Sequence, residues 1–107
     1  MCHLQLNLVE AAHIIPVAAP RGSDETSNGL ALCPSHHEAY DDAIVGVRPD
    51  YRIILNDDLL RTLRRTGRDG QAERFRSDLQ ERIIIPTSTS DRPRPEYLRR
   101  GLEIRGW

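Results

Sequence analysis

Two short apolar segments separated by a long irregular stretch limit what the N-terminal half of this chain can fold into. Residues 5–15 lead through an apolar run past His13, and residues 30–33 form a second apolar run. Pro16 and Pro20 end the first run, and the residues that follow are Gly, Ser, Asp and Asn without periodicity, which is typical of a loop. The pattern predicts two short strands, the first ending near His13, joined by a long loop of the kind that often carries function.

A helix is expected directly after the second strand. Pro34 is favoured in the first turn of a helix, and the following residues SHHEAYDDA continue for about two turns before Gly46. On that helix His37 and Asp41 are four residues apart and therefore share one face. His36 and Tyr40 share another face.

The remaining residues predict a smaller hairpin followed by helices. The expected elements are a hairpin from 44–47 and 51–55, a helix capped by Asn56 or Asp57 that runs to Gly67, an amphipathic segment over 69–82, a short extended stretch at 83–86, a turn with two prolines, and a helix over 95–104. This order indicates an α+β fold rather than parallel βαβ units. We expect a single domain over residues 1–107, with a core of about 5–57 and an arginine-rich helical part of about 58–107.

Targeting signals are lacking in the printed sequence. No apolar run approaches the ~18 residues of a membrane span, and the first residues lack the basic start and cleavage site of a signal peptide. We therefore expect a cytoplasmic protein with no membrane partner. In that reducing compartment Cys2 and Cys33 are not obvious disulfide partners.

The charge is distributed unevenly along the chain. Residues 1–60 hold three Arg against nine acidic residues, whereas residues 61–107 hold twelve Arg against seven, and there is no Lys. Arg suits phosphate contacts because its guanidinium group can bind two oxygens at once. The candidate DNA-backbone contacts are Arg61, Arg64, Arg65 and Arg68; the alternative is that they form a solvated helix face.

The polar residues around the predicted hairpin match the needs of phosphodiester hydrolysis. That reaction needs a base to activate water, a cation to neutralise charge, and a frame that holds them. His13 could be the base, and His37 and Asp41 could bind the cation. Asn28 could brace the loop through hydrogen bonds to the backbone. The alternatives are a packed core histidine at 13 and a plain surface contact between His37 and Asp41.

The segments AHIIP and SNGLALCPSHH resemble the His-Asn-His signature of HNH endonucleases, which have the ββα-metal fold. His13 and Asn28 are fifteen residues apart, and Asn28 and His37 are nine apart, as in that family. The Ala-Ala-His opening and the His-x-x-x-Asp of the helix are similar to a subgroup of bacterial restriction and defence nucleases. The later IIIP and RPRPEYL segments also resemble the tail of that subgroup.

The resemblance implies roles for individual residues. His13 would be the general base, Asn28 would restrain the geometry around it, and His37 and Asp41 would bind a divalent metal ion. Mg²⁺ or Mn²⁺ is favoured, with Zn²⁺ or Ni²⁺ as alternatives. Much of the family carries a metal ligand just before the base, and this chain has Ala12 there.

A second metal site is implied by relatives that carry two Cys-x-x-Cys pairs around a structural zinc. In this chain Cys2, Cys33 and His36 are the residues that could form such a site.

The function implied is metal-dependent hydrolysis of double-stranded DNA. A separate recognition domain or partner would supply specificity, the chain would be the C-terminal part of a larger protein or a minimal stand-alone version, and oligomers are conceivable. The alternative is a catalytically inactive nucleic-acid-binding or zinc-stabilised structural module, which the missing ligand at Ala12 keeps open. A metallohydrolase for small phosphodiesters is a third reading, but no pocket-lining motif supports it.

Overall fold

The computed structural model describes residues 1–2, 6, 8–16 and 25–107. In chain order the elements are β1 (Glu10–His13), η1 (Thr26–Asn28), β2 (Gly29–Leu32), α1 (Pro34–Asp41), β3 (Val45–Val47), β4 (Ile53–Leu55), α2 (Asp57–Arg65), α3 (Ala72–Asp78), η2 (Thr89–Asp91) and α4 (Pro95–Ile104). In the described residues, four α-helices and two two-stranded sheets make an α+β fold, as predicted.

The first sheet is the antiparallel pair of β1 and β2. Its register places Glu10 opposite Leu32 and His13 opposite Gly29. The first strand begins later than the apolar pattern predicts, because Leu8 and Val9 lie outside it and are exposed. Most of the predicted loop, residues 17–24, lies outside the described residues. The part that follows Glu25 is a 3₁₀ turn that leads directly into β2.

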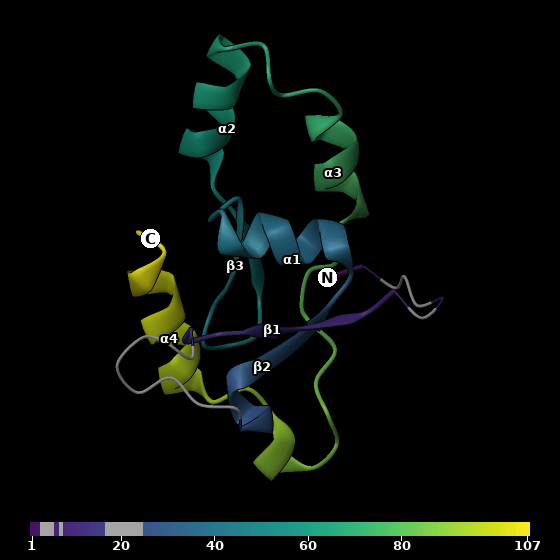
Figure 1. Cartoon of the computed structure of the whole chain (residues 1–107), viewed down its shortest axis with the longest axis vertical. Coiled ribbons are helices and arrows are strands. Elements are labelled where there is room, and N and C mark those ends of the chain that lie inside the picture. The colour runs from purple at the N-terminus through teal and green to yellow at the C-terminus, as the bar shows by residue number, and fades with distance from the viewer. Residues whose placement is uncertain (3–5, 7, 17–24) are drawn as a thin grey trace.

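Helix α1 follows β2 after one residue and packs against both strands of the first sheet (Figure 1). Pro34 occupies its first turn, where a missing N–H costs nothing. Its buried face contains His36, Ala39 and Tyr40. The adjacent face presents His37 and Asp41, which are both more exposed.

The two middle helices, α2 and α3, lie on the far side of α1 from β1 and β2 (Figure 1), whereas β3 of the second sheet contacts both α1 and α4. Asn56 caps α2 by accepting a hydrogen bond from the Leu59 amide at 3.0 Å, and its side chain also donates to the Ala43 carbonyl at 3.1 Å. The predicted extended stretch at 83–86 forms no strand. Just before it, Arg82 forms an isolated antiparallel bridge with Arg52, the residue that precedes β4, and the Ile83 amide donates to the Tyr51 carbonyl at 3.0 Å.

The core joins the first sheet, α1, β3 and α4. Its completely or almost completely buried side chains include Ala12, Ile14, Leu30, Leu32, Tyr40, Val45, Val47 and Leu98. Helix α4, the last element, packs beside β3 (Figure 1). Gly101 of α4 and Arg105, which follows α4, both lie close to Ile14, the residue after His13.

Among the described residues, no helix is long and apolar enough to cross a membrane.

Candidate active site and metal sites

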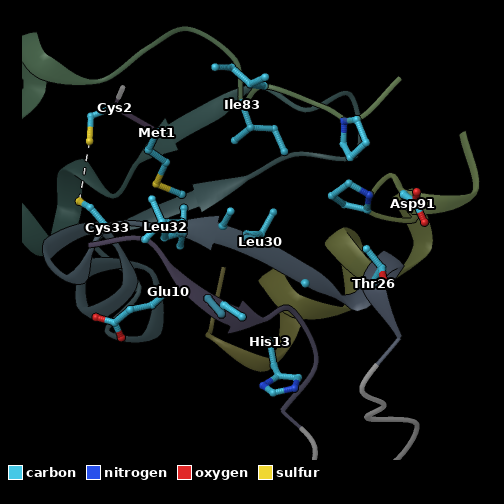
Figure 2. A pocket seen from close by; sticks show the side chains of 18 of the residues that line it. Met1, Cys2, Glu10, His13, Thr26, Leu30, Leu32, Cys33, Ile83 and Asp91 are labelled. Carbon is cyan, nitrogen blue, oxygen red and sulfur yellow. Dashed lines mark hydrogen bonds between the residues drawn. The ribbon is translucent and has the colours of Figure 1, made fainter. Parts of the chain in front are cut away.

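Asn28 fixes the backbone that follows His13. Its side chain is fully buried, its Oδ1 accepts from the Ile15 amide at 2.9 Å, and its Nδ2 donates to the Ile15 carbonyl at 2.9 Å. The Ile14 amide donates to the Asn28 carbonyl at 2.9 Å. Three hydrogen bonds therefore join this asparagine to the two residues after His13. The position of the His13 side chain, at the end of β1, is set by this backbone (Figure 2).

His37 lies between two carboxylates. Its Nδ1 is 3.1 Å from Oε2 of Glu10 on β1, and its Nε2 is 3.4 Å from Oδ2 of Asp41, one turn later on α1. The His37 side chain is 26% exposed and the Asp41 side chain 51% exposed, so the pair is open to solvent. The predicted helical pair of His37 and Asp41 thus lies together, with Glu10 as an additional neighbour.

The two contacts of His37 place different demands on its protonation. An ionised carboxylate only accepts hydrogen bonds, so the contact with Glu10 places the proton of a neutral imidazole on Nδ1. The lone pair on Nε2 then faces the Asp41 carboxylate, which is unfavourable unless a second proton or a cation lies between them. The 3.4 Å distance is longer than an ordinary N–H···O bond and close to the ~3.0–3.4 Å between two ligands that each lie ~2.1 Å from one ion. The donor pair fits a divalent cation.

Arg105 connects the end of β1 with the end of α1. Its Nη2 donates to the His13 carbonyl at 3.0 Å and to Oδ1 of Asp41 at 3.3 Å. Its Nη1 donates to the Ile14 carbonyl at 2.6 Å. Although it carries a full charge, the Arg105 side chain is only 7% exposed. The candidate base and the candidate ligand pair therefore adjoin one buried guanidinium group.

Cys2, Cys33 and His36 form a second cluster at the other end of the first sheet. The two sulfur atoms are 3.7 Å apart (Figure 2), and Sγ of Cys33 is 3.0 Å from Nδ1 of His36. In the described part of the chain this is the one group in which three such ligand atoms lie within 4.8 Å of one another. The sequence prediction for these three residues therefore corresponds to a real cluster that could hold a metal ion.

The cluster fits zinc by three independent features. Its donors are two sulfurs and one imidazole, three of the four ligands of a Cys₂His₂ or Cys₃His structural zinc site. The 3.7 Å between the sulfurs is close to the ~3.8 Å expected for two thiolates ~2.3 Å from a tetrahedral ion. Burial lowers the pKa of His36, which keeps its imidazole neutral as a ligand must be. Nδ1 of His36 is the nitrogen that faces Cys33, and within the described chain the buried Nε2 of His36 has no hydrogen-bond partner.

A groove of about 730 Å³ runs along the first sheet and includes both Cys2 and His13 in its lining (Figure 2). Apolar side chains such as Leu30, Leu32 and Ile83 line much of it. Its acidic lining residues are Glu10, Glu25 and Asp91; no arginine of the described chain lines it.

The predicted DNA-backbone arginines lie elsewhere. Arg61, Arg64 and Arg65 are exposed on α2, and Arg68 follows that helix. Arg61 forms an ion pair with Asp58. Figure 1 shows α2 separated from β1 and β2 by α1. These arginines are therefore accessible but do not border His13.

Sequence reasoning missed Glu10 and Arg105. Glu10 lies three residues before His13 on the predicted strand. Residues two apart on a strand point to the same face, so Glu10 shares a face with buried Ala12, and this pattern is a signal that Glu10 points toward the rest of the fold. For Arg105 there was no local signal, since 92 positions separate it from His13.

Comparison with known proteins gives one result for part of the chain. The family model described as HNH endonuclease matches residues 1–48, which supports the HNH family and a nuclease or nucleic-acid-related function. No curated protein and no solved structure matched the chain. The small α+β fold is compatible with an HNH-type domain.

Proposed function

We propose that this protein is a metal-dependent endonuclease that hydrolyses phosphodiester bonds of double-stranded DNA. The observation that carries the proposal is that residues 1–48, the segment matching the HNH endonuclease model, include His13, Asn28, His37 and Asp41. The order β1, β2, α1 supports a ββα core within that segment. We also propose membership of the bacterial restriction and defence subgroup, from its Ala-Ala-His opening and His-x-x-x-Asp helix.

His13 is the proposed general base. It takes a proton from the attacking water, and cleavage then leaves a 5′-phosphate and a 3′-hydroxyl. A positioned base contributes about 10²–10⁴ in rate, provided that its position is held. The hydrogen bonds of Asn28 and Arg105 to the residues around His13 supply that restraint.

His37 and Asp41 are the proposed ligands of the catalytic cation. A divalent ion bound there would neutralise charge on the scissile phosphate and the leaving oxygen. Glu10 accepts the Nδ1 proton of His37 and so leaves Nε2 available, an arrangement common for metal-binding histidines. Glu10 is thus a positioning residue, and it does not replace the ligand missing at Ala12. An exposed site with few protein ligands leaves room for the waters and phosphate oxygens that Mg²⁺ or Mn²⁺ prefers, and the imidazole ligand keeps Zn²⁺ or Ni²⁺ as alternatives.

Cys2, Cys33 and His36 are the proposed structural zinc ligands. Purified protein should contain zinc at about one ion per chain by elemental analysis, and Cys33→Ser should lose it. Protein prepared with zinc in the medium and purified without chelator, yet free of the metal, would contradict this assignment.

The substrate assignment to DNA rests on the family match and on the arginine-rich C-terminal half. Arg61, Arg64, Arg65 and Arg68 are proposed to contact the phosphate backbone, which carries no sequence information. Sequence or modification specificity then comes from a separate domain or a partner.

The test is nicking of supercoiled plasmid with Mg²⁺, Mn²⁺, Ni²⁺ or Zn²⁺ after removal of loosely bound metal with EDTA. Nicking should return when Mg²⁺ or Mn²⁺ is added, and Asp41→Ala should require more metal or lose activity. Asp42→Ala is the matched control, because it removes the exposed neighbouring carboxylate. Equal metal titrations of Asp41→Ala and Asp42→Ala would contradict the ligand assignment.

The second candidate is a binding module that retains the fold without hydrolysis. The buried Ala12 and the Cys2, Cys33 and His36 cluster favour it, since the best-formed metal site is a structural one. It predicts shifted DNA bands in a gel and intact plasmid under every metal condition.

A further inference from the structure

A buried arginine at the far end of the sequence contacts both parts of the candidate active site. Arg105 follows α4, outside the segment that matches the HNH model. Its guanidinium carbon lies 4.1 Å from the centre of the Tyr40 ring, within the range of a cation–π contact. With its side chain 7% exposed, this charge is held inside the protein by specific partners.

The hydrogen bonds of Arg105 divide between the two functional parts. On the β1 side it donates to the carbonyls of His13 and Ile14, at 3.0 and 2.6 Å. On the α1 side it donates to Oδ1 of Asp41 at 3.3 Å. The other carboxylate oxygen, Oδ2, is the one that faces His37. Arg105 therefore holds one oxygen of Asp41 while the second points toward the candidate cation position.

A purely structural explanation covers only some of these contacts. An arginine at the C-terminal end of a helix often donates hydrogen bonds to the last carbonyls of that helix, and Arg105 does so to the Gly101 carbonyl at 3.2 Å. That role does not require a partly exposed carboxylate on another helix or the carbonyl of the candidate base. The fork of the guanidinium group suits several acceptors at once, whereas lysine offers only one point of charge.

We propose that Arg105 is a positioning residue that sets the orientation of Asp41 for cation binding and fixes the backbone of His13. This proposal rests on the function proposed above. Its consequence is that the C-terminal helix completes an active site whose other members all lie within residues 10–41.

The direction in which cation affinity changes when Arg105 is removed distinguishes an orienting role from a simple charge effect. By Coulomb repulsion alone, a positive group beside a cation site weakens cation binding, and its removal strengthens binding. If Arg105 orients Asp41, its removal weakens binding instead, as the loss of an outer partner of a metal ligand usually does, by about 10–100-fold. Weaker binding after loss of the arginine can therefore not be a simple charge effect.

The experiment is a titration of the whole chain with Mn²⁺, followed by electron paramagnetic resonance. The site of interest is the one that Asp41→Ala abolishes. Arg105→Met, which keeps a long side chain against Tyr40, should bind Mn²⁺ at least 10-fold more weakly than wild type. Arg105→Lys should lie between them. Arg100→Met is the control, since Arg100 is an exposed residue of α4 whose ion pair among the described residues is with exposed Glu103 at 3.2 Å.

The possible results separate this proposal from the proposed function. Unchanged or tighter Mn²⁺ binding by folded Arg105→Met overturns the positioning role and leaves the ligand assignment standing. A wild type that binds no Mn²⁺, or an Asp41→Ala variant that binds it normally, overturns both. If circular dichroism shows Arg105→Met unfolded, Arg105→Lys decides: weaker binding supports the role, and wild-type binding overturns it.

Discussion

At the residue scale, the candidate cation site is defined mainly by the two contacts of the His37 imidazole. Both of its nitrogens face carboxylates, and only one can carry the proton of a neutral ring. Glu10 sets which nitrogen that is by accepting from Nδ1. The role proposed for Glu10 depends on accepting a hydrogen bond and not on being charged.

That distinction makes a prediction for two variants of Glu10. Glu10→Gln keeps a side-chain oxygen that can accept the Nδ1 proton, whereas Glu10→Ala removes the acceptor. Plasmid nicking should fall about 10-fold or more in Glu10→Ala and remain within about threefold of wild type in Glu10→Gln. Equal losses in the two variants would show that the charge matters and would contradict the positioning role.

Tyr40 provides a prediction for alkaline pH. Burial, the largest influence, raises its pKa from 10.0 to about 12. Because the folded protein favours the neutral phenol, its contribution to stability is present below pH 10 and is lost as pH rises toward 12. Absorbance at 295 nm should show a late ionisation near pH 12 that Tyr40→Phe removes and Tyr97→Phe retains. A titration unchanged by Tyr40→Phe would contradict this environment.

The residues that sequence could identify are those fixed by short-range spacing. His37 and Asp41 lie together because a helix brings positions four apart to one face. Cys33 and His36 lie close together for the same reason, because they are three residues apart at the start of α1. By contrast, the contacts of Arg105 with His13 and Asp41 depend on how α4 packs, and no local pattern encodes that packing.

At the scale of elements, proline is the reliable sequence signal for where helices begin. Pro34 and Pro95 occupy the first turns of α1 and α4, as the sequence indicated. The start of β1 was placed too early, because apolar Leu8 and Val9 are exposed instead of paired. Apolar character alone does not show where backbone pairing begins.

The approach of α4 to β1 gives a prediction for Gly101. A Cβ atom there would lie 2.9 Å from Cγ2 of Ile14, 3.0 Å from its carbonyl oxygen and 3.2 Å from the Tyr40 hydroxyl. Gly101→Ala should therefore lower the free energy of unfolding by about 1–2 kcal/mol in urea, despite the better helix propensity of alanine.

The matched control for Gly101 is Gly70, where an added Cβ would have no neighbour within 4 Å. Gly70→Ala should leave the unfolding free energy within about 0.5 kcal/mol of wild type. If Gly101→Ala were equally harmless, α4 would not pack as closely against Ile14 as described.

At the scale of the whole molecule, the exposed arginines and the candidate active site lie in different places. The candidate site is acidic around Glu10 and Asp41, whereas the exposed arginines of α2 lie on the other side of α1 (Figure 1). A duplex bound by both would therefore have to extend across α1. Uneven charge along the sequence predicted the arginine-rich part but could not show its distance from His13.

This arrangement predicts the salt dependence of DNA binding. Replacing Arg61, Arg64, Arg65 and Arg68 together by Ala should reduce the slope of log K against log salt by up to about 3–4, with the same effect on duplexes of unrelated sequence. Arg99→Ala, an exposed substitution on α4, is the control and should leave the slope nearly unchanged. Fluorescence anisotropy measures the slope, and an unaltered slope in the fourfold variant would place the DNA contacts elsewhere.

The most direct test of the central claim is the single-turnover rate of plasmid nicking by wild type and His13→Ala, measured in the same Mg²⁺ or Mn²⁺ buffer. The proposed mechanism predicts a loss of about 10²–10⁴ in rate for His13→Ala, with its circular dichroism spectrum and DNA affinity retained. Nicking by His13→Ala at the wild-type rate would contradict the mechanism.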